Sequence, residues 1–329
     1  MTHREPMIQM NLQSLQKMVM MKEFNDTPPP NHEMLTEMAY SKDGAFLLVS
    51  ASEDMYLYDC NRTSFARKIE SKKYGVGVSQ FLSNTTCVYA STKDDDAVRH
   101  LDIPTKSYIR YYPGHTKRVH CISTFPCEYL FATASHDRTI RFWDRRTHDN
   151  TGLMCMTSVP LIALDPEGII IAVGIRNSVI RLFDVRSYDV APFAVFDLPP
   201  TDETWLRIEF STCGKLIIIS TNRRNVKVIN AFDGSIVRTI TTNSDPVYRF
   251  FPALTPDAKY MILPLSTGKI EGFSMETGKS ELQLYTHRRN AAFGVAFNPS
   301  TFCMNSLGHK LLFWAPSDSF VYSQHYNHY

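Results

Sequence analysis

A histidine, a serine and an aspartate that could form a hydrolytic triad occur together in the middle of this 329-residue sequence. His115 follows Gly114, and Ser135 and Asp137 come shortly before Trp143. A serine hydrolase also needs a sharp Gly-x-Ser-x-Gly turn and an oxyanion site, and the sequence around Ser135 has no such turn. The same residue types can instead form a buried hydrogen-bonded chain, in which each donor and acceptor is satisfied. We therefore predict a structural tetrad and no catalytic site, made of His115, Ser135, Asp137 and Trp143.

Other residues that could do chemistry are not spaced for it. The three aspartates at 94–96 lack the glycine and the distal glutamate of a calcium-binding loop. The seven cysteines include no Cys-x-x-Cys pair, so they indicate neither a disulfide framework nor a zinc site. The histidines from 100 to 148 do not have the i, i+4 spacing of a helical metal site, and the 14 glycines form no phosphate-binding run. We predict that the chain is not an enzyme and needs no cofactor or metal.

The element that must position the tetrad is one unit of a repeat. A three-residue ending, which is complete only at Phe142-Trp143-Asp144, recurs in altered form along the sequence. The intervals between successive endings are 43, 42, 40, 46, 44 and 41 residues. This interval matches a four-stranded propeller blade and exceeds the roughly 33 or 34 residues of helical hairpin repeats. Turn residues and apolar runs of five or six residues inside each unit also favour strands. The seven endings are Leu57-Tyr58-Asp59, His100-Leu101-Asp102, Phe142-Trp143-Asp144, Leu182-Phe183-Asp184, Val228-Ile229-Asn230, Gly272-Phe273-Ser274 and Phe313-Trp314-Ala315. The sequence thus predicts an all-β fold, a single seven-bladed β-propeller.

The last repeat lacks a fourth strand. The segment that contains Leu12, Leu15, Met18, Met20 and Phe24 could be a short amphipathic helix or a strand. Ring closure favours a strand from about Gln16 to Phe24, because pairing removes an exposed sheet edge. We predict that this segment pairs with the strand that contains Leu312 and Phe313. The domain prediction is an N-terminal segment with the closing strand (1–31), seven repeats (32–317) and a polar tail (318–329).

Composition and charge set limits on location and partners. The apolar content of 43% suits a large core, and the net charge is only +2. No apolar stretch reaches the roughly 18 residues that would cross a bilayer, and the N-terminus lacks the apolar core of a signal peptide. The sequence therefore predicts neither a membrane span nor secretion.

Basic residues recur in the internal turns of the repeats. In a propeller, the turns between the second and third strands share one face with the connections between blades. Only the first such turn, with Glu53 and Asp54, is acidic; the others contain Lys93, Arg138, Arg176, Arg223, Arg224, Lys269 and Lys310, and the connections add Lys72, Lys73, Lys117, Arg118, Arg288 and Arg289. Arginine binds phosphate through a bidentate fork, so this face is a candidate phosphopeptide-binding surface. The residues that we select for it are Lys117, Arg118, Arg138, Arg176, Arg223 and Arg224.

Two other interpretations of this basic face stay open. Surface turns are often rich in lysine and arginine without binding anything. The phosphates of a nucleic acid would also satisfy such a patch. Direct nucleic-acid binding is not expected, because the sequence lacks the base-stacking strings of an RNA-binding sheet.

Several strings outside the repeat endings are similar to one family. They are Ser-Lys-Lys-Tyr-Gly-Val at 71–76, Tyr-Ile-Arg-Tyr-Tyr-Pro-Gly-His at 108–115, Lys-Arg-Val at 117–119, Gly-Leu-Met at 152–154 and Asp-Pro-Glu-Gly at 165–168. Between about Leu12 and Trp314 the chain resembles the WD40-repeat subunit shared by COMPASS-type histone lysine methyltransferases and by nuclear phosphatase and cleavage-polyadenylation complexes. The resemblance implies a nuclear, non-catalytic adaptor. Its implied partners are the N-terminal region of a methyltransferase, phosphatase regulatory and cleavage-polyadenylation subunits, and the phosphorylated tail of RNA polymerase II.

The chain departs from the family pattern at several positions. Asn230 and Ser274 replace the final aspartate of two repeats, and the N-terminal segment is rich in methionine and contains three consecutive prolines. These changes indicate a divergent paralogue, and they affect its choice of complex more than its fold. A different function is suggested by Trp143-Asp144-Arg145-Arg146 and Phe183-Asp184-Val185-Arg186, which match the Trp-Asp-x-Arg box of substrate receptors of cullin-type ubiquitin ligases. The aspartate and arginine of this box also stabilise the turn that follows them.

Overall fold

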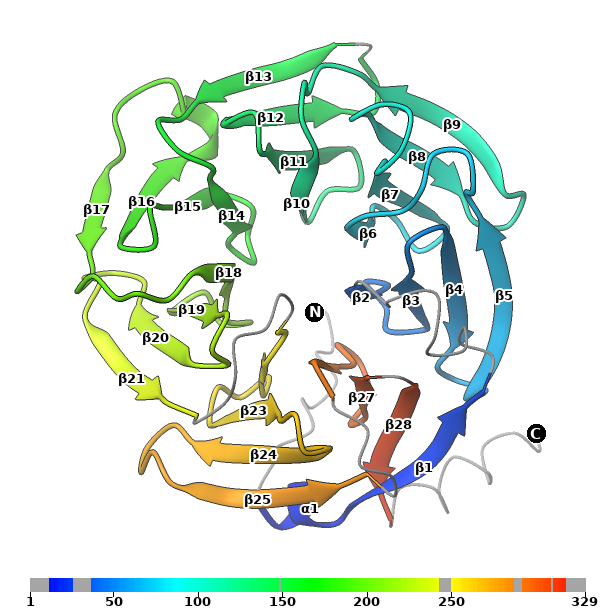
Figure 1. Cartoon of the computed structure of the whole chain (residues 1–329), viewed down its shortest axis with the longest axis vertical. Helices are drawn as coiled ribbons and strands as arrows, with labels where there is room; N and C mark the ends of the chain where they lie inside the picture. The colour runs from blue at the N-terminus through cyan, green and yellow to red at the C-terminus, as the bar shows by residue number, and fades with distance from the viewer. Residues whose placement is uncertain are drawn as a thin grey trace, which may run out of the picture.

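A computed structural model describes residues 12–25, 37–147, 149–242, 250–286, 292–308 and 310–317. In these residues, seven four-stranded antiparallel sheets surround a central axis as blades, as Figure 1 shows. The other regular elements of the described residues are a short helix, α1 (Leu12–Gln16), and a 3-10 turn, η1 (Val185–Ser187). The predicted seven-bladed all-β propeller is confirmed.

The strands of each blade are given from the innermost, beside the axis, to the outermost. This is also their order in the sequence, except in blade 7, whose outermost strand is β1. The first four blades are blade 1 (β2 Glu37–Tyr40, β3 Phe46–Ser50, β4 Asp54–Asp59, β5 Ser64–Glu70), blade 2 (β6 Ser79–Phe81, β7 Thr86–Ala90, β8 Val98–Asp102, β9 Ser107–Tyr112), blade 3 (β10 Val119–Thr124, β11 Leu130–Ser135, β12 Thr139–Asp144, β13 Asn150–Cys155) and blade 4 (β14 Leu161–Leu164, β15 Ile170–Ile175, β16 Val179–Asp184, β17 Ala194–Asp197). The others are blade 5 (β18 Trp205–Phe210, β19 Leu216–Thr221, β20 Val226–Asn230, β21 Ile236–Ile240), blade 6 (β22 Ala253–Leu254, β23 Tyr260–Pro264, β24 Lys269–Ser274, β25 Ser280–Tyr285) and blade 7 (β26 Gly294–Phe297, β27 Met304–Leu307, β28 Leu311–Pro316, β1 Met18–Phe24).

Local sequence explains why each unit forms a blade. The apolar runs form the second strands, which neighbouring blades cover on both faces, as in β19 with its buried isoleucines. The turn before β15 contains Gly168, which has a positive φ of 72°, a conformation that suits glycine. In the same turn, the Asp165 carboxylate accepts hydrogen bonds from the amides of Ile169 and Ile170, both at 2.7 Å.

The hydrophobic core is divided among the blade interfaces. Seven clusters of buried side chains are present in the described residues, and each fills the space between two adjacent blades. Trp143, for example, belongs to the cluster between blades 2 and 3. A blade is therefore stable only with neighbours on both sides, which requires a closed ring. No helix among the described residues has the length and apolar character needed to cross a membrane.

The N-terminal strand closes the ring. β1 pairs antiparallel with β28, with Lys22 opposite Phe313 and Glu23 opposite Leu312, so the predicted closure is confirmed. The strand begins at Met18 and not at Gln16, because residues 12–16 form the helix α1. Leu15 of this helix is fully buried in the cluster between blades 6 and 7, which accounts for the helical turn. The predicted domain boundaries stay predictions, and the tail at 318–329 lies outside the described residues, as do the three prolines at 28–30.

Candidate phosphate-binding face and central cavity

A chain of hydrogen bonds links four side chains inside blade 3. The Trp143 indole N–H donates to Thr133 Oγ1 at 2.8 Å, and Thr133 Oγ1 lies 2.8 Å from His115 Nε2. On the other side of the ring, His115 Nδ1 lies 2.8 Å from Asp137 Oδ2. Since the indole can only donate, the consistent arrangement has the Thr133 hydroxyl donating to Nε2 and Nδ1–H donating to the carboxylate. All four groups are then satisfied by a neutral imidazole.

The hydroxyl in this chain belongs to Thr133, whereas the sequence predicted Ser135. The Ser135 hydroxyl donates instead to the carbonyl oxygen of Lys117 at 2.6 Å and accepts from the Asp137 amide at 3.0 Å. Thr133 and Ser135 lie two residues apart on β11, so their side chains are on the same face of the sheet. Trp143 on β12 pairs with Phe131, so Thr133 is its diagonal neighbour and provides the hydroxyl that the indole reaches.

Burial and hydrogen bonding set the charge states of this network. Burial lowers the pKa of His115, and the hydrogen bond to Asp137 only partly opposes this shift. Burial raises the pKa of Asp137, but hydrogen bonds from Thr139, His115 and the Thr116 amide outweigh it and lower this pKa to about 2. At neutral pH the pair is an uncharged histidine beside a carboxylate, as a structural network requires.

Five of the six predicted phosphate ligands are exposed on one end of the ring. We call this end the upper face; it is formed by the internal turns at 136–138, 176–178 and 222–225 and by the connections between blades, such as 113–118. The exposed residues are Lys117, Arg118, Arg138, Arg176 and Arg223. Among the described residues, no carboxylate lies within ion-pair distance of Arg118, Arg138 or Arg176, so these charges can bind a ligand.

The sixth residue, Arg224, does not belong to this surface. It is only 3% exposed, and its guanidinium donates to the carbonyl oxygens of Pro264 at 2.7 Å and Ala292 at 2.8 Å. Arg224 also has a positive φ of 59°. Burial lowers the pKa of Arg224. Its role is to satisfy carbonyl groups beneath blades 6 and 7.

Lysines in the other turns are paired with acidic side chains. Lys93 forms an ion pair with Glu53, Lys269 with Glu271 and Lys310 with Glu23. On the upper face, the basic side chains without an ion-pair partner among the described residues therefore include Arg118, Arg138 and Arg176 on blades 3 and 4. Arg288 and Arg289 lie outside the described residues.

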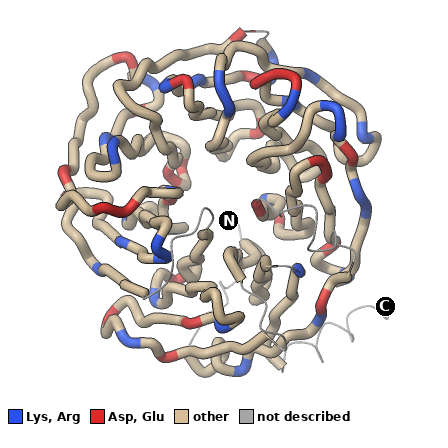
Figure 2. Tube along the Cα trace, in the orientation of Figure 1, with Lys and Arg blue, Asp and Glu red and all other residues tan. Residues whose placement is uncertain are grey.

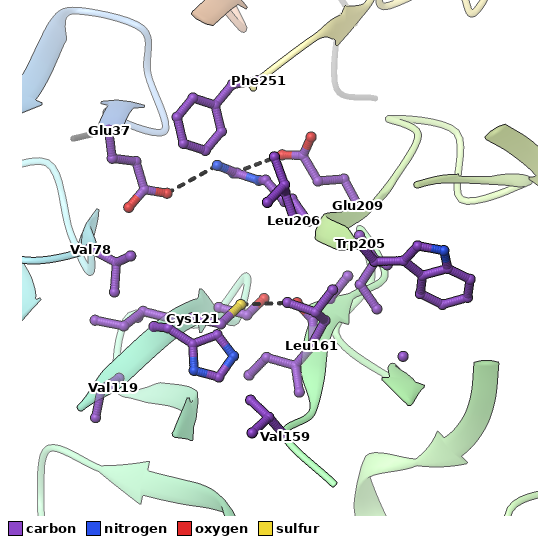
Figure 3. A pocket seen from close by; sticks show the side chains of 18 of the residues that line it. Glu37, Val78, Val119, Cys121, Val159, Leu161, Trp205, Leu206, Glu209 and Phe251 are labelled. Atoms are coloured by element: carbon purple, nitrogen blue, oxygen red, sulfur yellow. Dashed lines mark hydrogen bonds and ion pairs between the residues drawn. The ribbon is translucent and has the colours of Figure 1, made fainter. Parts of the chain in front are cut away.

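A cavity of about 920 Å³ runs along the axis of the ring below this face. Arg118, His136, Arg176 and Asn177 line its upper end. Its walls combine polar and apolar side chains, and Figure 3 shows Val119, Val159, Leu161 and Leu206 among the apolar ones. The mouth is thus cationic, an arrangement that can hold a phosphate at the rim.

An ion cluster that no sequence pattern indicates crosses the middle of the cavity. Arg207 of blade 5 reaches Glu37 of blade 1 at 3.0 Å and Glu209 at 2.7 Å, as the dashed lines in Figure 3 show. Burial raises the pKa of Glu37, and Arg207 partly opposes this shift. The Glu37 carboxylate also accepts from the Ser79 amide and the Gln80 side chain. These partners account for the buried charges, and the cluster ties two non-adjacent blades together.

The described residues contain no candidate metal cluster, and the two ligase-like boxes contact their own residues. No group of three or more histidine, cysteine, aspartate or glutamate side chains is placed to hold a metal there. The two Trp-Asp-x-Arg-like boxes are engaged internally: Arg146 Nη2 lies 2.6 Å from Asp144, and Arg186 Nη2 lies 2.6 Å from Asp184. Their arginines therefore stabilise the turn after the third strand of each blade.

Comparison with known proteins places this geometry in a family. Residues 32–253 match the family model described as nucleolar protein 10-like, N-terminal domain, a β-propeller. WD repeat-containing protein 82 of Drosophila melanogaster is 34% identical over 87% of this chain and 92% of its own length. The Set1 complex component swd2 of Schizosaccharomyces pombe is 34% identical over 69% of this chain and 67% of its own length, and the COMPASS component SWD2 of Saccharomyces cerevisiae is 28% identical over 69% and 72%. The chain belongs to the family of WD-repeat propellers that includes WD repeat-containing protein 82 and these Set1 and COMPASS components.

Proposed function

We propose that this protein is a non-catalytic adaptor subunit of a nuclear chromatin complex. It docks a histone lysine methyltransferase through the N-terminal region of that enzyme and links it to the phosphorylated tail of RNA polymerase II. The same subunit joins phosphatase regulatory and cleavage-polyadenylation subunits in a termination complex. Support for the methyltransferase link comes from the names of two relatives, which are components of Set1 and COMPASS complexes.

The observation that carries the recruitment step is the pair of arginines at the mouth of the cavity. Arg118 and Arg176 come from adjacent blades and line one opening. A phosphorylated serine or threonine carries close to two negative charges and three acceptor oxygens, which two arginine forks can bind together. An unphosphorylated peptide offers these groups only neutral hydroxyls, so the site would prefer the phosphorylated form.

Calorimetry with a polymerase-tail peptide tests this step. The phosphorylated peptide should bind more tightly than its unphosphorylated form, and binding should weaken with salt, because exposed charges are screened over roughly 8–10 Å at 0.1–0.15 M salt. The double variant Arg118→Glu, Arg176→Glu should weaken phosphopeptide binding at least about tenfold, which corresponds to about 1.4 kcal/mol. Reversal of Arg223 alone should have a smaller effect, since Arg223 does not line the cavity.

Arg62→Glu is the matched control for this experiment. Arg62 is 85% exposed in its side chain and lies in the turn between the third and fourth strands of blade 1, at the opposite end of the ring. The same change of charge there should leave phosphopeptide binding unchanged. Equal affinity for the two peptides at low salt would leave the protein as a scaffold without a phosphate-reading role. Copurification with methyltransferase or with phosphatase subunits then tests the docking role separately.

A further inference from the structure

Two sequence segments from different blades meet at the outer rim between blades 1 and 2. Tyr108, on the outermost strand β9, places its hydroxyl 3.0 Å from the Tyr89 hydroxyl and 3.4 Å from Ser71 Oγ. Its ring packs edge-on against Tyr74, with the ring centroids 5.9 Å apart. Tyr89 and Ser71 are themselves hydrogen-bonded at 2.9 Å. Tyr108 is therefore held at both its ring and its hydroxyl.

A buried arginine, Arg99, holds the Tyr74 ring in place. The Arg99 guanidinium lies 3.5 Å from the centroid of the Tyr74 ring. It also forms a bidentate pair with Asp95, at 2.8 and 2.9 Å. Because both partners of Tyr74 are fixed, the aromatic surface beside β9 is preorganised and would lose little side-chain entropy on binding.

The outer side of β9 exposes large side chains on a free strand edge. Tyr108 is 46% exposed, Ile109 51% and Tyr111 65%. β9 is the last strand of its sheet, so its outer backbone groups pair with no strand among the described residues. Tyrosine and arginine are the residue types that dominate protein interfaces, and an open strand edge offers main-chain hydrogen bonds.

Charge distinguishes this edge from another exposed edge of the same ring. Residues 103–113 contain Lys106 and Arg110 and no acidic residue. In the described residues, no carboxylate lies within ion-pair distance of either side chain. Figure 2 shows basic positions in blue on β5 and β9 along this part of the rim. The edge of blade 4, residues 188–200, instead contains two aspartates and no basic residue.

We propose that the edge of β9 binds an extended, acidic segment of a partner protein, which adds to blade 2 as a fifth strand. The backbone of the segment pairs with the outer N–H and C=O groups of β9. Its apolar side chains contact Tyr108, Ile109 and Tyr111, and its carboxylates pair with Lys106 and Arg110. This surface lies on the rim, whereas the phosphate site lies at the axis, so an adaptor can use both at once. The proposal does not depend on phosphate binding.

Fluorescence anisotropy with three synthetic peptides of about ten residues tests the proposal. The first alternates glutamate and valine, the second alternates lysine and valine, and the third is the glutamate peptide with a central proline. The glutamate peptide should bind at least tenfold more tightly than the lysine peptide, and the central proline should abolish binding because it removes a main-chain donor. Hydrogen exchange of the amides at 107–112 should slow only with the glutamate peptide.

Variants of exposed side chains locate the binding surface. Tyr111→Ser should weaken binding of the glutamate peptide about tenfold, and Lys106→Glu should weaken it and favour the lysine peptide. The matched control is Tyr285→Ser, because Tyr285 is 64% exposed on the outermost strand of blade 6. This control and Arg176→Glu should leave the affinity unchanged.

Four outcomes would overturn the proposal. One is equal binding of all three peptides, and another is no binding of any. A third is a loss of binding in Arg176→Glu but not in Tyr111→Ser, which would move the site to the upper face. The fourth is a different occupant of the β9 edge. A dimer that Tyr111→Ser dissociates would show that a second copy of the chain occupies the edge. Tighter binding of oligouridylate than of the glutamate peptide would show that RNA occupies it.

Discussion

Blade 3 and blade 7 both bury a tryptophan near the end of the third strand, but they are completed by different means. In blade 3, Trp143 begins a chain of side-chain hydrogen bonds that ends at Asp137, and all its members lie between residues 115 and 143. In blade 7, the Trp314 indole N–H donates to Ser306 Oγ at 2.9 Å. The outermost strand of that blade, β1, comes from the opposite end of the sequence.

This difference separates local from long-range stabilisation. The blade 3 network uses side chains from one short stretch of sequence, and its loss leaves one or two polar groups unsatisfied. Blade 7 needs the two ends of the chain to meet, and its loss exposes a whole strand edge together with the cluster that contains Met18. Loss of the closing strand should therefore lower the stability of the protein much more than loss of the blade 3 network.

The largest expected effect is that of deleting residues 1–25. This change removes β1 and exposes the edge of β28, whose six residues are all buried, so the shortened protein should aggregate. Size-exclusion chromatography and thermal melting measure the effect. Deletion of residues 1–11 is the matched control and should have little effect, because α1 and β1 remain. A shortened protein that lacks residues 1–25 but stays monomeric with unchanged melting would rule out the closing role.

An intermediate effect is expected for His115→Ala or Asp137→Ala in blade 3. Each change leaves a buried partner without its hydrogen bond and should lower the free energy of unfolding by about 1–3 kcal/mol. Phosphopeptide binding should fall only as far as the folded fraction falls. Full stability with complete loss of binding would instead indicate a direct functional role for this pair.

Hydroxyl variants sharpen the contrast between the two blades. Thr133→Val removes the hydroxyl that serves both Trp143 and His115, whereas Ser306→Ala removes the acceptor of Trp314 alone. Urea unfolding should therefore show a larger decrease in the free energy of unfolding for Thr133→Val than for Ser306→Ala. Equal losses would mean that the extended network adds nothing to a single tryptophan hydrogen bond.

The architecture could be predicted because it depends on features that repeat along the sequence. The spacing of the aromatic endings fixes the number of blades, and the missing strand of the last repeat identifies β1 as the closing strand. The choice between helix and strand in the N-terminal segment was harder to predict. The helical turn at 12–16 depends on Leu15 entering the core between blades 6 and 7, and no local pattern shows that contact.

The site was harder to predict because its residues depend on long-range placement. Arg223 and Arg224 are identical in type and adjacent, yet Arg223 is exposed, whereas Arg224 is buried and donates to carbonyl groups of other blades. Glu37 and Arg207 are 170 residues apart in sequence and meet only across the axis of the ring. A sequence pattern can place a charge in a turn, but it cannot show which neighbouring atoms the side chain meets.

The smallest expected difference between the two blades is in the pH dependence of stability. His115 is held neutral, with its pKa lowered from 6.5, so below about pH 6.5 the unfolded chain binds more protons than the folded one. The free energy of unfolding should therefore fall as the pH drops from 7 to 5. His100 and His120 add to this fall, since burial lowers the pKa of each to about 4. Asp137 does not contribute in this range, because its stabilising effect is lost only between its unfolded pKa of 3.8 and about 2.

Denaturant unfolding at pH 7 and pH 5 can separate the contribution of blade 3. In His115→Gln the fall in unfolding free energy should be smaller than in the wild type, because one of the three titrating histidines is gone while the other two remain. In Ser306→Ala the fall should equal that of the wild type, because the Trp314 hydrogen bond contains no group that titrates in this range. If all three proteins lost the same free energy, His115 would have the same pKa in the folded and unfolded states. The neutral imidazole between Thr133 and Asp137 would then not be what distinguishes blade 3 from blade 7.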